Sequence, residues 1–175
     1  MLKADGVRQA RGTAKPAGAR PPRLNHALYA QWVEGMKSKR RGIRIKGTRG
    51  HPVVAKALVR FASWLRQTQE FPIRVPVYLS PLEKVRALDG RLCSASFFAP
   101  WDRNVEPYIR IATGDYRELH EEMGRDNALA SFIMSLAHEV VHYQQWVQTG
   151  AVQERGVARR AEGMLRRYES TVSRP

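Results

Sequence analysis

The chain has 175 residues, which suits one domain with some tail to spare. Lys and Arg number 30 against 16 Asp and Glu, a formal net charge of +14, so the surface attracts nucleic acid or another polyanion at low salt. The single cysteine, Cys93, excludes both an intramolecular disulfide framework and a cysteine-based zinc knuckle. No apolar run approaches the roughly 18 residues of a membrane span, so we expect a cytoplasmic protein with no membrane contact.

The amino-terminal part is basic and poor in large apolar side chains. Residues 1–23 are rich in Arg, Lys, Ala, Gly and Pro, a composition that cannot bury itself and predicts a disordered basic tail. Residues 24–175 are then one domain, with a short amphipathic helix expected from Asn25. The dense positive stretch 37–46 is expected to stay solvated and, with the tail, to contact a polyanion.

The middle of the chain predicts one helix followed by a small sheet. Pro52 suits the first turn of a second helix, where a missing N–H costs nothing, and apolar residues recur behind it at helical spacing. Residues 73–79 alternate apolar and polar as a half-buried strand does, and Pro76 favours an edge position. Further strands are predicted around 93–98 and 108–112, giving a mostly antiparallel sheet.

The carboxyl-terminal part predicts three helices. A short polar helix is expected over 115–123, and Asp126 is an N-cap candidate for a long helix over about 127–148. Gly150 suits the left-handed residue that ends this helix. A last helix is expected over about 153–172. This order of elements is that of a small α+β domain with N-terminal helices and two helices at the end.

The long helix contains the motif His138-Glu139-Val140-Val141-His142. Two histidines four residues apart project from one helix face, about one turn from each other, so their rings can bind one ion. Zn²⁺ accepts neutral imidazole nitrogens and lowers the pKa of a bound water to about 7. Glu139 is placed to take a proton from that water and later return it to a leaving amine. The pattern predicts hydrolysis of peptide bonds by metal-activated water; two histidines satisfied within a core helix are the alternative.

A catalytic zinc site needs a third protein ligand. Glu162 lies 20 residues after His142, and a helical hairpin turning at Gly150 would bring it back beside the histidines. Glu169, one heptad further along the same face, is its main rival. The alternative for Glu162 is a surface glutamate paired with a neighbouring arginine.

His138, Glu139, His142 and Glu162 together resemble the pattern of the gluzincin clan of zinc peptidases, and above all its one-domain members. The resemblance covers about 100 residues, from the strand near Ile73 to the last helix, and outside the two motifs it is one of layout. It implies a zincin-like fold and an endopeptidase activity that requires Zn²⁺. Thermolysin-like members have an aspartate four residues after the third ligand, where this chain has Arg166.

The resemblance also implies that an edge strand beside the motif helix binds the substrate as an added strand. The best match in this sequence is the segment Tyr108, Ile109, Arg110, Ile111 and Ala112, which could equally be an ordinary core strand. A donor to the developing oxyanion is also needed. Tyr108, Tyr143 and Tyr168 are candidates by chemistry, and the sequence does not separate them.

The excess of positive charge leaves a second hypothesis from another class. The chain could be a basic nucleic-acid-binding protein on a zincin-like scaffold without proteolytic activity, acting through its tail and the stretch 37–46. Metal content, peptide cleavage and salt-sensitive nucleic-acid binding separate the two hypotheses.

Overall fold

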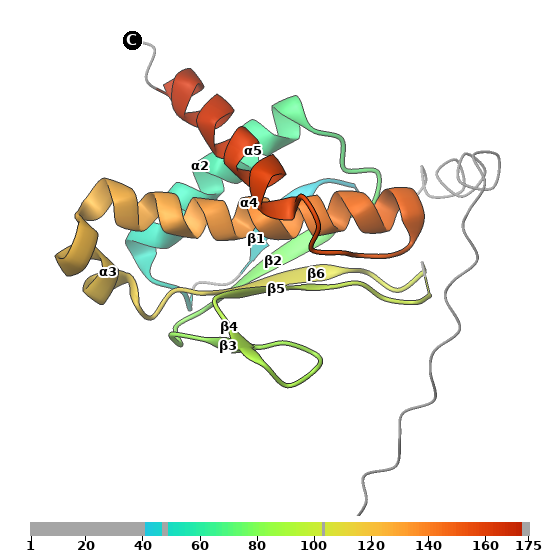
Figure 1. The fold of residues 1–175 in the computed structure, drawn as a ribbon, viewed down its shortest axis with the longest axis horizontal. Coiled ribbons are helices and arrows are strands. Elements are labelled where there is room, and N and C mark those ends of the chain that lie inside the picture. The colour runs from blue at the N-terminus through green and yellow to red at the C-terminus, as the bar shows by residue number, and fades with distance from the viewer. Residues whose placement is uncertain (1–40, 47–48, 103, 173–175) are drawn as a thin grey trace, which may run out of the picture.

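The computed structural model describes residues 41–46, 49–102 and 104–172. The expected tail 1–23 and the helix expected from Asn25 lie outside these residues. The described chain forms a sheet with helices packed against one face and a small hairpin beyond the other (Figure 1). The domain is thus mixed α and β, as expected, and none of the described helices is long and apolar enough to cross a membrane.

The main sheet has four strands in the order β1-β2-β6-β5. They are β1 (Ile43–Lys46), β2 (Val75–Ser80), β6 (Tyr108–Ala112) and β5 (Ala95–Phe98). The expectation of a mostly antiparallel sheet is wrong, because β1 pairs with β2 and β2 with β6 in parallel, and only β5 and β6 run antiparallel. Helix α2 (Pro52–Thr68) links β1 to β2 and returns the chain to the same end of the sheet, which makes that pair parallel.

Strand β1 lies within the basic stretch that we expected to be solvated. Ile43 is fully buried and pairs with Val75, so the expectation fails for this part of the stretch. Strand β2 is also not at an edge, although it contains Pro76. The ladder with β6 begins only at Val77, so the missing N–H of Pro76 falls before the strand is flanked on both sides.

A two-stranded hairpin has its turn at Asp89-Gly90. Strand β3 (Val85–Arg86) pairs antiparallel with β4 (Leu92–Cys93), and the Gly90 N–H donates to the Ala87 carbonyl at 3.0 Å. Gly90 has a φ of 87°, a left-handed conformation that favours glycine. The hairpin leads directly into β5 and so lies beside the cleft described below.

Three helices follow the sheet, namely α3 (Tyr116–Met123), α4 (Arg125–Thr149) and α5 (Val157–Val172). Helix α4 begins after Gly124, so Asp126 lies in its first turn instead of capping it. It ends as predicted at Gly150, whose φ is 75°. Helix α5 begins at Val157, later than the sequence predicts, and leaves a loop after Gly150.

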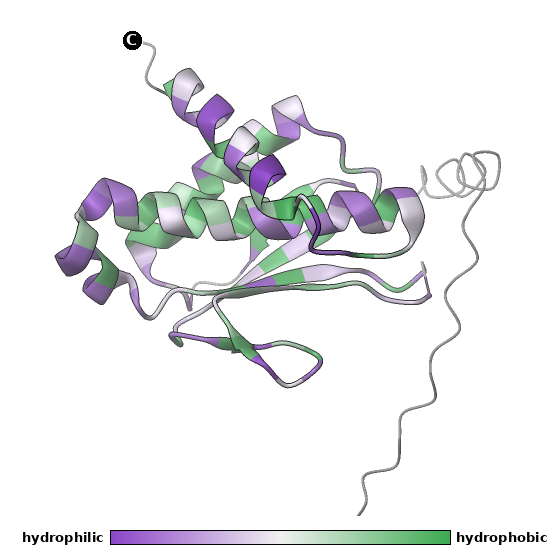
Figure 2. Ribbon diagram, in the orientation of Figure 1, coloured by the Kyte–Doolittle hydropathy of each residue, from purple (hydrophilic) through white to green (hydrophobic). Residues whose placement is uncertain are grey.

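Helix α4 packs against β5 and β6 and against the other three helices, and its buried apolar residues, green along its ribbon in Figure 2, belong to the hydrophobic core. Tyr143 is fully buried, and its hydroxyl donates to the Ile73 carbonyl at 2.7 Å while accepting from the Ile73 N–H at 3.1 Å. The Trp146 indole donates to the Pro100 carbonyl at 3.0 Å. These bonds fix the helix against the backbone at two points, one directly after the motif and one a turn beyond it.

We expect Tyr143→Phe to lower the free energy of unfolding by about 1–3 kcal/mol, because two buried backbone groups of Ile73 lose their partner. Urea denaturation monitored by circular dichroism measures the change. Tyr78→Phe is the matched control, since Tyr78 is 45% exposed. An equal loss in both variants would contradict a role for the buried hydroxyl.

Candidate metal centre

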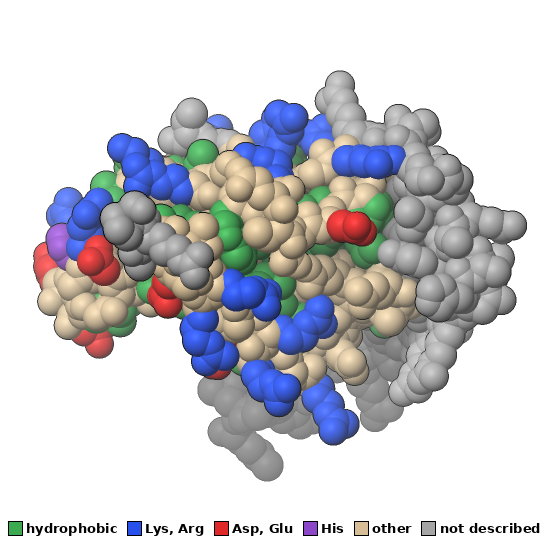
Figure 3. All heavy atoms as spheres, turned by 90° about the horizontal axis from the view of Figure 1, so that it is seen from above, with side chains coloured by type: hydrophobic (Ala, Val, Ile, Leu, Met, Phe, Trp, Pro, Cys, Tyr) green, Lys and Arg blue, Asp and Glu red, His purple; other side chains and the backbone are tan. Residues whose placement is uncertain are grey.

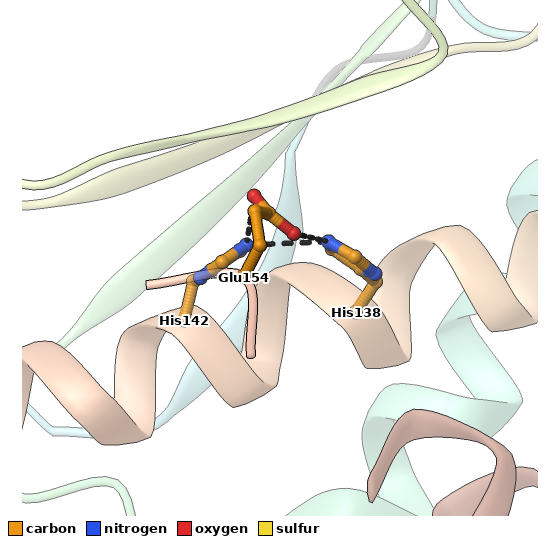
Figure 4. A group of neighbouring side chains, drawn as sticks. All are labelled: His138, His142 and Glu154. Atoms are coloured by element: carbon orange, nitrogen blue, oxygen red, sulfur yellow. Dashed lines mark hydrogen bonds and ion pairs between the residues drawn. The ribbon is translucent and has the colours of Figure 1, made fainter. Parts of the chain in front are cut away.

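The two motif histidines and one glutamate meet above the middle of α4 (Figure 4). The Nε2 atoms of His138 and His142 lie 3.2 Å apart. The Glu154 carboxylate places one oxygen 3.3 Å from His138 Nε2 and the other 3.2 Å from His142 Nε2. Among the described residues these three form the group of histidine, cysteine and acidic side chains that could hold a metal ion.

The spacing of these donor atoms fits a tetrahedral ion. Ligands about 2.0–2.1 Å from zinc at tetrahedral angles lie roughly 3.3 Å from each other. The two histidine nitrogens, 3.2 Å apart, match that edge length, and each carboxylate oxygen of Glu154 lies at a similar distance, 3.3 or 3.2 Å, from a different histidine nitrogen. Two imidazole nitrogens with one carboxylate also form a donor set that catalytic zinc sites use. The residues present therefore suit such an ion.

The surroundings of His138 and a hydrogen bond at His142 both favour metal binding. Burial, and next the nearby His142, lower the pKa of His138 below its usual value, which favours the neutral ring that a metal requires; the Glu154 carboxylate opposes this shift. At His142 the Nδ1 atom lies 3.3 Å from the Gln145 side-chain oxygen. That oxygen can only accept, so Nδ1 carries the proton and the Nε2 lone pair is free to bind the ion.

Gln145 also holds the loop that delivers Glu154. The side-chain oxygen of Gln145 accepts a hydrogen bond from the backbone N–H of Gln153 at 3.0 Å, and Gln153 directly precedes Glu154. Gln145 is buried on α4. The side chain of Glu154 is 78% exposed and meets the protein chiefly through the two histidines. One buried amide oxygen therefore positions both a ring and the loop.

The structure brings Glu154, and neither Glu162 nor Glu169, to the histidines. The sequence predicts that the last helix begins at about Gln153, which would put Glu154 in its first turn, whereas in the structure Glu154 lies in the loop before α5. Glu162 and Glu169 are exposed on α5. The signal that could have found Glu154 is Gly156, whose φ of 77° breaks the chain between this glutamate and the helix.

Glu139 lies in the cleft that borders the two histidines. It is only 7% exposed, and burial, followed by the charge of Glu154, raises its pKa to about 7; the backbone N–H of Phe97 donates to it and opposes the shift. The cleft has a volume of about 350 Å³ and is lined by α4, the hairpin, β5 and the Glu154 loop. A buried carboxylate and the donor cluster thus share one opening to solvent.

Strand β5, and not β6, is the edge strand beside this cleft. Tyr108, Ile109, Arg110 and Ile111 belong to β6, which is paired on both sides by β2 and β5, so the expectation that they offer a free edge is wrong. The alternative of a core strand holds instead. The sequence predicts both β5 and β6 as strands, but its local pattern does not indicate which of them lies at the edge of the sheet.

The tyrosines considered as oxyanion donors do not line the cleft. Tyr143 is buried and bonded to Ile73, as described above. Tyr168 packs edge-on against Phe61, with 5.0 Å between ring centroids. The cationic side chain at the cleft is Arg91, which is exposed and pairs with Asp89 at 2.6 Å.

No protein-family model, no curated protein and no solved structure matches the chain. What is known of the site therefore comes from the geometry of this chain, which supports a metal-binding group of two histidines and a glutamate.

We expect Gln145→Ala to weaken zinc binding by about 10- to 100-fold, because His142 and the Glu154 loop lose their shared support. Competition with a fluorescent zinc chelator gives the affinity. Gln148→Ala, an exposed amide on the same helix, is the matched control and should bind zinc as the unchanged protein does. Equal affinities in the two variants would show that Gln145 plays no part.

We expect Glu154→Ala to lose stoichiometric zinc after dialysis, whereas Glu162→Ala should retain one equivalent. The reason is that a two-histidine site lacks the third ligand and its negative charge. Atomic absorption on the dialysed proteins measures the metal. Loss of zinc from Glu162→Ala alone would restore the assignment made from sequence.

Proposed function

We propose that the protein is a zinc-dependent peptidase that hydrolyses peptide bonds by metal-activated water. The observation that carries this proposal is the group of His138, His142 and Glu154, whose ligand atoms all lie within 4.8 Å of one another, beside a cleft that also contains a buried carboxylate. His138, His142 and Glu154 would hold the ion, which would supply Lewis-acid activation of water and of the scissile carbonyl. With two histidines on a helix and a later glutamate, the arrangement is gluzincin-like.

Glu139 is assigned the proton transfers. It follows His138 directly and lines the same cleft, so its carboxylate can accept a proton from the attacking water and return it to the leaving amine. The Phe97 N–H, which donates to this carboxylate, holds it in place. Burial excludes bulk water from the carboxylate, which strengthens its interactions with the reacting groups.

The edge of β5 is suited to bind an extended peptide. The Ser94 carbonyl accepts from the Ala112 N–H at 2.8 Å, so backbone groups alternate along the strand and those of Ala95 and Phe97 point away from β6. The Phe97 N–H donates to Glu139, which leaves the Ala95 groups and the Phe97 carbonyl for a substrate. Both residues line the cleft. A substrate added as a further strand along this edge would carry its carbonyl past the metal ligands.

Glu139→Gln should abolish peptide cleavage, lowering kcat/KM by at least about 100-fold, while zinc content stays at one equivalent. The amide keeps the shape of the side chain but cannot accept the proton. Cleavage of a fluorogenic peptide library and atomic absorption on the same preparation supply the two readings. Glu121→Gln on α3, exposed and outside the cleft, is the control and should cleave normally. Full cleavage by Glu139→Gln would remove its assignment as the base.

A further inference from the structure

The sheet face turned away from the helices is lined by aromatic and cationic side chains. Residues paired in register point to the same side of a sheet. Lys46, Tyr78 and Arg110 therefore form one row across β1, β2 and β6. Arg44, on the same face of β1, lies two residues before Lys46. The partly buried isoleucine between them points to the helices.

The aromatic rings on this face form a connected group. Tyr78 is 45% exposed and contacts Tyr108 edge-on, with ring centroids 6.1 Å apart. Phe98 stacks on Tyr108 at 4.7 Å, and the Arg110 guanidinium lies 5.9 Å from the Tyr108 centroid. Arg110 is in turn held by the Arg86 carbonyl of the hairpin. Tyr108 is thus supported by Phe98 and Arg110, and Tyr78 is the ring of this group most open to solvent.

Four cations gather beside these rings. Arg41, Arg44, Lys46 and Arg74 line a hollow of about 410 Å³, and none of the acidic residues that the structure describes lines it. Arg74 pairs with Glu106 at 3.2 Å, whereas the other three form no ion pair with a described acidic residue. The helical side of the molecule also exposes more Lys and Arg than acidic side chains (Figure 3). The four-cation hollow differs from the positive charge elsewhere on the surface because it lies next to an exposed aromatic ring, since Lys46 pairs in register with Tyr78.

We propose that this face, composed of the four-cation hollow and Tyr78, binds single-stranded nucleic acid. Phosphates would occupy the hollow, and a base would stack on Tyr78. Flat aromatic rings interleaved with cations suit a strand whose bases are unpaired, because a duplex keeps its base faces stacked internally. None of these residues lines the metal-site cleft, so the proposal does not rest on peptidase activity.

Fluorescence anisotropy of the full chain with a labelled oligothymidylate tests the electrostatic part. Arg44→Ala/Lys46→Ala should weaken binding roughly tenfold and reduce the slope of log K against log salt by about 1.4. Arg159→Ala/Arg166→Ala removes two exposed charges from α5 and is the matched control, expected to stay near the unchanged protein. Equal weakening by both pairs, or none by the first, would overturn the proposal in favour of general charge or of another segment of the chain.

The stacking part is tested at Tyr78. Tyr78→Thr keeps a strand-forming residue but removes the ring, and should weaken oligothymidylate binding roughly tenfold; Tyr78→Phe should bind normally. Labelled heparin, a polyanion without bases, should bind Tyr78→Thr as it binds the unchanged protein. Normal oligothymidylate binding by Tyr78→Thr, an equal loss of heparin, or tighter binding of a blunt duplex than of the single strand would each contradict the proposed mode.

Discussion

The site depends on the way helix α4 is held against the sheet. Tyr143 and Trp146 bond to backbone groups of Ile73 and Pro100, and most of the helix in this region is buried. These bonds restrain rotation of the helix, so the two imidazoles that precede Tyr143 stay 3.2 Å apart at their Nε2 atoms, close enough to share an ion. The same rigidity places Glu139 under β5, where the Phe97 N–H meets it.

The parts of the structure that the sequence predicts correctly are those decided by local spacing. The histidines share a face because they are four residues apart on a helix, and Gly150 ends that helix because glycine accepts a left-handed backbone. The sequence pattern does not predict strand β1, because Arg44 and Lys46 interrupt its two isoleucines. The strand is buried by pairing with a parallel strand about 30 residues away. The prediction of Glu162 as third ligand differs from the structure because the start of α5 depends on how the preceding loop folds back. No local sequence pattern determines that fold.

The two proposals use opposite surfaces of the same sheet. Strand β5 offers its free edge and its helix-facing side to the cleft, whereas the outward side chains of β1, β2 and β6 form the basic aromatic face. Because successive residues of a strand point to opposite sides, one short sheet can support both a peptide and a polyanion. A protein bound to nucleic acid through this face would leave its cleft accessible.

The exposure of Glu154 has a kinetic consequence. Two donors are fixed on a rigid helix, while the third lies on a surface loop that a buried amide oxygen of the helix holds at Gln153. Opening of that loop alone would uncover one side of the ion without unfolding any helix or strand. Capture and release of the metal would then be governed by loop motion on a far shorter timescale than global unfolding.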